Sequence, residues 1–248
     1  MEEKKFRNTV EFQVSGDYAL FSDPVTRVGG EKFSYQIPTY EALKGILHSV
    51  FWKPTIKWII DEARVMKPIQ METKSILPLV YNGGNEQAYC TYLKDVTYQV
   101  RAHFVQNKNR PELAHDWNEN KYHNMAKRMI ERGGRRDIFL GTRECQGYVE
   151  PCEFGEGTGY YDGAPGEIAF GFSYHGMTYA DEAELEEDRG KLTVRFWNPV
   201  MRKGYIKFCT PEECVKKRHL HAMEIKRFPD KKFSGLEEFG KGEQDEFI

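Results

Sequence analysis

The sequence predicts an α+β protein, because two segments of helical periodicity are separated by segments in which apolar and polar residues alternate. Hydrophobic residues make up 40% of the 248 residues, which is enough for a substantial core. After Pro151 the helical periodicity stops, and short strand-like segments separated by glycines and acidic turns follow. These observations favour a mixed domain followed by a small antiparallel β-sheet domain.

The first elements along the chain are a strand, a helix and a second strand. Residues 9–14 alternate between apolar and polar side chains, as in a half-buried strand. Pro38-Thr39 opens a helix that ends at Pro54, because proline cannot continue the hydrogen-bond ladder. Residues 55–60 then predict a strand, which residues 63–69 extend.

The next elements repeat this order. Residues 71–92 predict an irregular insertion, a hairpin or finger, with Asn82-Gly83-Gly84-Asn85 at its tip. A strand over 96–104, a helix over 116–132 and a strand over 138–149 follow. The resulting β-α-β…β-α-β order predicts a ferredoxin-like (RRM-type) domain, which suits single-stranded RNA. The predicted organisation is this domain over 1–150 with its insertion near 70–92, the small β domain over 151–228, and a polar acidic tail over 229–248.

Charge is segregated in a chain whose net charge is −2. Residues 181–188 hold six acids and are expected to form a solvated loop, whereas 216–232 hold seven Lys/Arg against two acids. Some of the 14 tyrosines and 16 phenylalanines are expected on a surface, where base stacking is one use for them. The charge distribution is therefore compatible with nucleic-acid binding despite the low net charge.

The cysteines and the hydropathy pattern predict a soluble, cytoplasmic protein without membrane association. The five cysteines form no C-x-x-C motif, so reduced thiols are the simplest interpretation. No apolar run approaches the roughly 18 residues of a membrane-spanning helix. No cluster of histidine and acids has metal-ligand spacing, so no metal or other cofactor is expected.

The run from Gly133 to Glu144, GGRRDIFLGTRE, is the most informative motif. Gly133 and Gly134 let the backbone reach positive φ and approach a ligand, while Arg135, Arg136 and Arg143 supply planar charges that match phosphate geometry. The motif therefore predicts a phosphate-binding face. A helix C-cap followed by a solvated charge run is the alternative interpretation.

Seven segments occur together, in order and with similar spacing, and carry a family resemblance. They are Gly16–Phe21, Pro38-Thr39, Leu43–Ile46, Trp52–Thr55, Arg64–Ile69, Gly133–Gly147 and Pro199–Ile206. Over about residues 8–210 the chain resembles the CRISPR-associated Cas5 family, in the Dvulg (type I-C) subtype. The resemblance implies a repeat-associated RAMP protein with a ferredoxin-like domain and a small C-terminal sheet.

The resemblance also implies an activity and partners. Members of this subtype cut the CRISPR repeat RNA without metal and then stay on the 5′ handle of the crRNA, together with the backbone and large subunits of Cascade. Target DNA is a further possible partner through that complex. Other Cas5 subtypes only hold the handle, so a non-catalytic structural subunit is the alternative. An RRM-like protein unrelated to CRISPR is a more distant interpretation.

Lys121, Tyr122 and His123 are the candidate catalytic residues. Cleavage by the neighbouring 2′-hydroxyl needs a base, an acid and a cation, and these three side chains supply all of them. The family resemblance implies a tyrosine just before Trp52, where this chain has Phe51, and a Lys-His pair, where this chain has Lys121-Tyr122. Which tyrosine replaces that hydroxyl, if any, stays open. Lys53 is a weaker phosphate-binding candidate.

Geometry limits the pairing of Lys121 with His123. In a helix, at about 100° per residue, they point roughly 160° apart, whereas in an extended segment they share a face. Tyr122 matches the apolar face of the predicted helix, so a core tyrosine is an equally good interpretation. A helix start with a surface lysine and histidine is the alternative for the whole segment.

Overall fold

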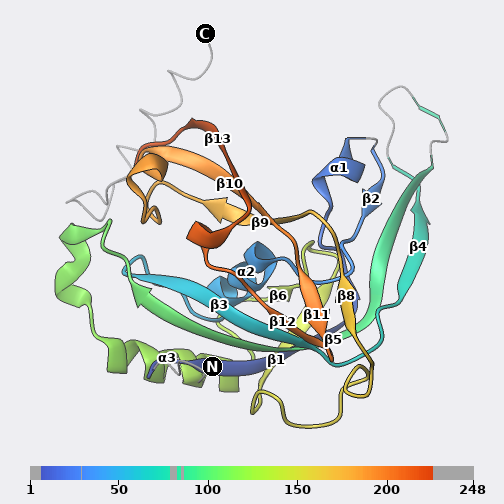
Figure 1. The fold of residues 1–248 in the computed structure, drawn as a ribbon, viewed down its shortest axis with the longest axis horizontal. Coiled ribbons are helices and arrows are strands. Elements are labelled where there is room, and N and C mark those ends of the chain that lie inside the picture. The colour runs from blue at the N-terminus through green and yellow to red at the C-terminus, as the bar shows by residue number, and fades with distance from the viewer. Residues whose placement is uncertain (1–6, 29, 79–82, 85–86, 226–248) are drawn as a thin grey trace.

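The computed structural model describes residues 7–28, 30–78, 83–84 and 87–225, which form a large sheet, a smaller sheet and a few helices (Figure 1). In these residues the large sheet has the strand order β6-β7-β1-β5-β3-β12-β11-β8, and β2 and β4 pair with the other half of β5. Its strands are β1 (Val10–Ala19), β2 (Lys32–Phe33), β3 (Ile56–Val65), β4 (Met71–Ile76), β5 (Ala88–Gln106), β6 (Ile138–Phe139), β7 (Gln146–Pro151), β8 (Glu167–Ala169), β11 (Val200–Arg202) and β12 (Tyr205–Lys207).

The smaller sheet has the order β13-β10-β9 and lies on the far side of α2 from α3 (Figure 1). Its strands are β9 (Ser173–Thr178), β10 (Lys191–Trp197) and β13 (Lys216–Ala222). The helices are α1 (Pro24–Arg27), α2 (Tyr40–Val50) and α3 (Glu119–Glu131), with 3-10 turns η1 (Pro111–Asp116), η2 (Glu186–Asp188) and η3 (Pro211–Glu213). The predicted α+β class is confirmed at this level.

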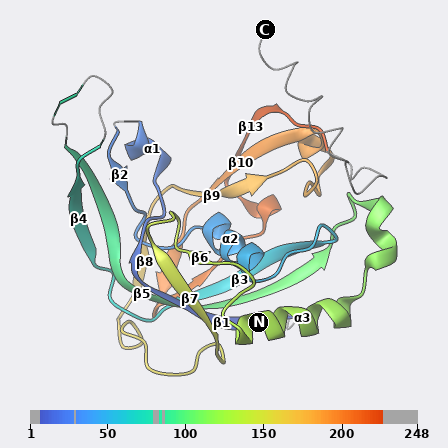
Figure 2. The ribbon, with the colours of Figure 1, turned by 180° about the vertical axis from the view of Figure 1, so that it is seen from behind.

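Helices α2 and α3 begin where the sequence provides a capping side chain. Thr39 accepts a hydrogen bond from the Ala42 N–H at 3.1 Å, and Asn118 accepts one from the Lys121 N–H at 2.9 Å. Helix α2 buries Leu43, Ile46, Leu47 and Val50, and α3 buries Tyr122, Ala126 and Ile130, as their periodicity predicts. Helix α3 runs beside β1 and β7 (Figure 2).

The central strands alternate in direction in the order β7-β1-β5-β3, and along the chain they occur as β1-α2-β3-β5-α3-β7. The predicted insertion is a paired hairpin, because β4 continues into β5 with Met71 opposite Leu93 and Ile76 opposite Ala88. Strand β5 is therefore much longer than the predicted strand over 96–104. Asn82 and Asn85 at the predicted tip lie outside the described residues.

The single strand predicted over 138–149 is instead two short strands, β6 and β7, joined by a turn. Gly141 in this turn has φ +98°, and a Cβ there would lie 2.0 Å from the Leu20 carbonyl oxygen. The Leu20 N–H also donates to the Leu140 carbonyl at 2.9 Å. Only glycine permits this close approach, so the turn interrupts the strand.

Residues 151–228 do not form one separate sheet as predicted. Strands β8, β11 and β12 extend the large sheet, with Tyr205 of β12 opposite Arg64 of β3, and only β9, β10 and β13 form the small sheet. The physical reason is the edge of β3, whose unpaired backbone groups β12 satisfies. The predicted tail over 229–248 lies outside the described residues. Within the described part of the chain, no helix has the length and apolar character needed to cross a membrane.

Candidate functional site

The start of α3 places a hydroxyl, a carboxylate and an ammonium together. The Tyr122 hydroxyl lies 2.6 Å from the Asp116 carbonyl oxygen and 2.7 Å from Asp116 Oδ2, and it accepts a hydrogen bond from Thr55 Oγ1 at 3.1 Å. Lys121 Nζ donates to Asp116 Oδ1 at 3.2 Å. We call Asp116, Lys121, Tyr122 and Thr55 the α3 cluster.

The α3 cluster holds Asp116 in its charged form. The hydrogen bond from Tyr122 lowers the pKa of the Asp116 carboxyl, and Lys121 and the charge of Lys53 lower it further. Burial raises the pKa of Tyr122, whose side chain is inaccessible to solvent. Phe51 packs against Tyr122 with ring centroids 6.1 Å apart. The tyrosine that packs against Phe51 is therefore buried, and its hydroxyl is already hydrogen-bonded.

The structure does not bring His123 to the same place. Residues 119–131 are helical from the first turn, so Lys121 and His123 lie on opposite sides of α3. His123 Nε2 is 3.0 Å from the carbonyl oxygen of Thr9, next to the first strand. Of the three candidate catalytic residues, Lys121 and Tyr122 therefore meet at Asp116, whereas His123 contacts the large sheet.

The turn after α3 caps one helix and docks on another. The Gly133 and Gly134 N–H groups donate to the carbonyls of Ile130 and Met129, at 2.9 and 2.8 Å, and both glycines have positive φ. The N–H groups of Arg135 and Arg136 donate to the same Ser49 carbonyl at the end of α2, at 3.2 and 3.1 Å. The two glycines therefore form the helix C-cap of the alternative interpretation.

We call residues 133–136 the arginine turn; its arginine side chains face solvent, as does Arg143 in the turn between β6 and β7. Arg135, Arg136 and Arg143 are exposed, and none forms an ion pair with a described residue. The Arg143 guanidinium lies 6.0 Å from the Phe139 ring centroid. Three residues after Ser49, Trp52 is 41% exposed, and the half-buried Lys53 follows it. The end of α2 therefore lies between the two: Ser49 contacts the arginine turn, and the charge of Lys53 acts on Asp116 of the α3 cluster.

His48 lies one turn before Phe51 and has a buried ring nitrogen. Its Nε2 has no hydrogen-bond partner among the residues that the structure describes, and burial lowers its pKa to about 4, so the ring is neutral at neutral pH. Its ring centroid is 6.2 Å from that of Trp52. The neighbouring charges that affect it are Lys44 and Glu41 on its own helix, rather than those of the α3 cluster.

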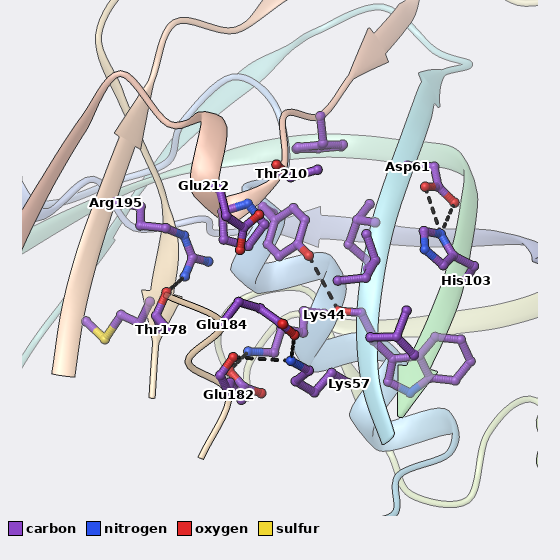
Figure 3. A pocket seen from close by; sticks show the side chains of 18 of the residues that line it. Lys44, Lys57, Asp61, His103, Thr178, Glu182, Glu184, Arg195, Thr210 and Glu212 are labelled. Atoms are coloured by element: carbon purple, nitrogen blue, oxygen red, sulfur yellow. Dashed lines mark hydrogen bonds and ion pairs between the residues drawn. The ribbon is translucent and has the colours of Figure 1, made fainter. Parts of the chain in front are cut away.

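A cavity of about 500 Å³ lies between β3 and the small sheet, and Figure 3 shows its charged lining. Lys44 pairs with Glu182 at 2.6 Å, Lys57 pairs with Glu184, and His103 Nδ1 is 2.9 Å from Asp61. The loop expected over 181–188 is therefore solvated only in part, because Glu186 and Glu187 are exposed, whereas Glu182 and Glu184 pair with lysines. These two acids dock on buried lysines, whose charges need partners in a poorly hydrated place.

His175, Cys209 and Cys214 are the group of described residues that could hold a metal ion, with ligand atoms within 4.8 Å of one another. The spacing in the sequence did not indicate this group, because His175 lies in β9, more than thirty residues before Cys209. Their present contacts are structural: His175 Nε2 is 3.1 Å from the Cys209 carbonyl, Nδ1 accepts from Arg195, and the two sulfurs are 3.7 Å apart. Metal coordination would have to replace one of the histidine contacts.

Sequence analysis missed Asp116 and Thr55, the partners of Tyr122. Thr55 is 67 residues away in the chain, so no spacing relates the two. Asp116 gave one weak signal, because it closes a short polar segment just before the Asn118 cap. Only the pairing of β3 with β5 brings Thr55 to the start of α3, since the Asn107 N–H donates to the Thr55 carbonyl at 2.8 Å.

Comparison with known proteins gives the family. Residues 9–209 match the family model described as CRISPR-associated protein (Cas_Cas5). The chain belongs to the Cas5 family of CRISPR-associated proteins. The matched range contains the α3 cluster and the arginine turn, and it ends before β13.

Two curated Cas5 relatives are both named CRISPR pre-crRNA endoribonuclease Cas5d. The protein from Mannheimia succiniciproducens is 33% identical over 161 residues, which cover 55% of this chain and 69% of the relative. The protein from Thermus thermophilus is 30% identical over 152 residues, covering 57% of this chain and 63% of the relative. The chain thus spans slightly less than two thirds of the second relative.

Two solved structures share the fold. One, described as a CRISPR-associated protein, has a TM-score of 0.68 and 32% identity, covering 85% of this chain and 96% of that chain. The other, a functionally uncharacterized protein from Streptococcus mutans, has a TM-score of 0.65 and 34% identity with the same coverage. The large sheet with a small second sheet is therefore the architecture of Cas5 relatives.

Removing the Tyr122 hydroxyl should destabilise the protein in a pH-dependent way. Tyr122→Phe should lower the free energy of unfolding by about 1–2 kcal/mol, because Thr55 and Asp116 lose a buried partner. The folded-state pKa of Asp116 is lowered, so its stabilising contribution is present above the usual aspartate pKa and lost as the pH falls through the lowered value. Urea unfolding should therefore show the largest deficit at neutral pH and a smaller one in acid.

The matched control is Tyr148→Phe, because Tyr148 is exposed. It should leave the unfolding free energy unchanged at every pH. A deficit for Tyr122→Phe that stays constant from neutral to acidic pH would contradict the coupling between Tyr122 and Asp116.

Proposed function

We propose that this Cas5 protein cleaves the CRISPR repeat RNA and then holds the crRNA 5′ handle in a type I-C Cascade. The observation that carries the proposal is the match to two relatives named pre-crRNA endoribonuclease, within a family match over residues 9–209. We further infer a ferredoxin-like unit, because the order β7-β1-β5-β3 with α2 and α3 between strands follows its split β-α-β pattern. The other Cascade subunits, and target DNA through them, are the proposed partners, in the cytoplasm.

The proposed reaction is attack of a 2′-oxygen on the adjacent phosphorus. The 2′-O–P bond forms, the P–O5′ bond breaks, the 2′-proton passes to a base, and the 5′-oxygen receives a proton. The products are a 2′,3′-cyclic phosphate and a 5′-hydroxyl, with no metal required. Lys121 would stabilise the negative phosphorane, since a fixed cation close to the reacting phosphate lowers the barrier.

His123 is the proposed acid/base, because an imidazole ring can both accept and donate a proton. In the helical arrangement it lies across α3 from Lys121, so both act on one phosphate only if RNA opens the first turn of the helix. The phosphate backbone of the handle would lie along Arg135, Arg136 and Arg143, with Lys53 as a weaker contact. Gly133 and Gly134 would let that backbone approach the turn.

A non-catalytic subunit that only binds the handle is the second candidate. The observation that favours it is the packing at the start of α3. Phe51 has no hydroxyl, Tyr122 is buried, and His123 already contacts the Thr9 carbonyl. The exposed arginine turn would serve this function without any catalytic group.

Cleavage of the protein's own repeat RNA in EDTA separates the two candidates. The purified protein should cut the RNA and leave a 2′,3′-cyclic phosphate or its opened form, because the proposed chemistry uses side chains alone. Loss of activity in EDTA that magnesium restores would contradict this mechanism. An inactive wild type whose Phe51→Tyr variant cuts would establish the handle-binding candidate and show which hydroxyl is missing.

Substitutions in α3 test the proposed catalytic residues. His123→Ala should slow single-turnover cleavage by on the order of 10²–10⁴-fold with little change in RNA affinity, as expected for a general acid/base. Lys121→Ala should also slow cleavage, through lost charge stabilisation. Lys127→Ala, an exposed lysine on the same helix, is the control and should cut normally. Near-normal cleavage by His123→Ala would remove His123 from the mechanism.

Salt dependence tests the arginine turn. Arg135→Ala/Arg136→Ala should weaken binding of the repeat RNA and make the slope of log K against log salt shallower by about 1–2. Each phosphate contact releases about one counterion on binding, so the loss of two contacts removes that release. Arg189→Ala is the control, since Arg189 is an exposed arginine that pairs with Glu186. An unchanged slope in the double variant would mean that the turn only caps α3.

A further inference from the structure

The small sheet has two chemically different faces. Thr193 Oγ1 donates to Asp188 at 2.9 Å, and Arg195 donates to His175, so these side chains of β10 point toward the cavity. Because successive side chains of a strand alternate, Val194 and Phe196 point to the opposite face. We call that opposite side the outer face of the small sheet.

The register of β13 adds basic side chains to the outer face. Lys216 lies opposite Phe196, and Arg218 lies opposite Val194. Residues directly opposite each other in an antiparallel pair share a face, so Lys216 and Arg218 belong to the outer face. Both are exposed, and no described residue forms an ion pair with either. The seven residues of β13 include no acid. Among the described residues, these two cations therefore make the face positive without an acidic partner.

Lys217, between them, faces the other way. It lies opposite Arg195 and its Nζ is 3.7 Å from Glu187 Oε1. The alternation of an exposed Lys216, a paired Lys217 and an exposed Arg218 supports the assignment of faces. It also supplies a matched control on the same strand.

Two phenylalanines form a stack beside these cations. The Phe172 and Phe196 rings are nearly parallel, at 18°, with centroids 5.1 Å apart. Phe172 is 57% exposed, so one face of this stack is open to solvent. An exposed ring supported from behind by a second ring is a rigid platform, on which any unpaired base can stack.

We propose that the outer face of the small sheet binds single-stranded nucleic acid, with a base stacked on Phe172 and phosphates on Lys216 and Arg218. A duplex hides its base faces, whereas a single strand offers both a ring to the aromatic platform and a phosphate to each cation. Figures 1 and 2 show β13 and α3 on opposite sides of the large sheet, with α2, β3 and β5 between them, so this surface is separate from the α3 cluster. It does not depend on the proposed cleavage.

Affinity and salt dependence of an unstructured oligonucleotide test the cations. Fluorescence anisotropy would measure the affinity for oligo-U RNA and for oligo-dT DNA, each about 15 nucleotides long. Comparing the two affinities shows whether the face prefers RNA or DNA. Lys216→Ala/Arg218→Ala should weaken binding and reduce the salt slope by about 1.4, whereas Lys217→Ala should do neither. The series is repeated with Arg135→Ala/Arg136→Ala, so that binding at the arginine turn does not hide the effect.

Stacking is tested by Phe172→Ala and by photocrosslinking. Phe172→Ala should weaken binding by about 5- to 150-fold with an unchanged salt slope, because a lost stack costs about 1–3 kcal/mol. Tyr160→Ala, which removes another exposed aromatic ring, should have no effect. An oligonucleotide carrying 5-iodouracil should crosslink to the peptide that contains Phe172.

Two results would overturn the inference. The first is that Lys216→Ala/Arg218→Ala binds the oligonucleotides as tightly as its parent, both with the arginine turn intact and in the Arg135→Ala/Arg136→Ala variant. The second is that Lys217→Ala loses as much oligonucleotide affinity as Lys216→Ala/Arg218→Ala does. Cleavage of the repeat RNA by the same variants is scored separately. Oligonucleotide binding through this face without cleavage removes only the proposed activity, and cleavage without such binding removes only this inference.

Discussion

Strand β5 is the constraint on which the rest of the structure depends. Its 19 residues pair with β1 and β3 along one half and with β4 and β2 along the other. The end of β5 also fixes Thr55, because the Asn107 N–H donates to its carbonyl, and Thr55 in turn holds the Tyr122 hydroxyl. The position of α3 therefore follows from strand pairing far away in the sequence.

Helix capping decides which side chains can cooperate at the start of α3. The Asn118 cap fixes the first turn as helix, which directs Lys121 toward Asp116 and His123 toward Thr9. An N-cap contributes about 1 kcal/mol, and the buried Tyr122 in the same turn adds its packing and its hydrogen bonds, so RNA contacts would have to offset more than the cap to open this turn. The local helix and the proposed pairing of Lys121 with His123 on one phosphate are thus in competition, and under the proposed function this balance distinguishes an endonuclease from a subunit that only holds RNA.

Local signals in the sequence predicted much of the framework but little of the site. The helix start at Thr39, the glycine cap after α3 and the hairpin over β4 and β5 follow from short-range rules, and the structure has all of them. The Asn118 cap was not predicted, and α3 begins at Glu119 rather than at residue 116. The failures share one cause, which is dependence on distant partners. Strand β12 joined the large sheet because β3 offered an edge, and residues 181–188 docked because Lys44 and Lys57 are buried. Neither partner is visible from spacing.

This docking also explains how a chain of net charge −2 can present basic faces. Acids of the 181–188 loop neutralise Lys44, Lys57 and Arg110, three cations that are themselves buried and unavailable to RNA. Buried pairs of this kind need both partners, since an unpaired charge in such a place is strongly unfavourable. Three of the loop's acids are therefore committed to buried cations, while the exposed cations of the arginine turn stay without acidic partners among the described residues. The net charge counts buried, paired cations and exposed cations alike, but only the exposed cations can contact a phosphate backbone.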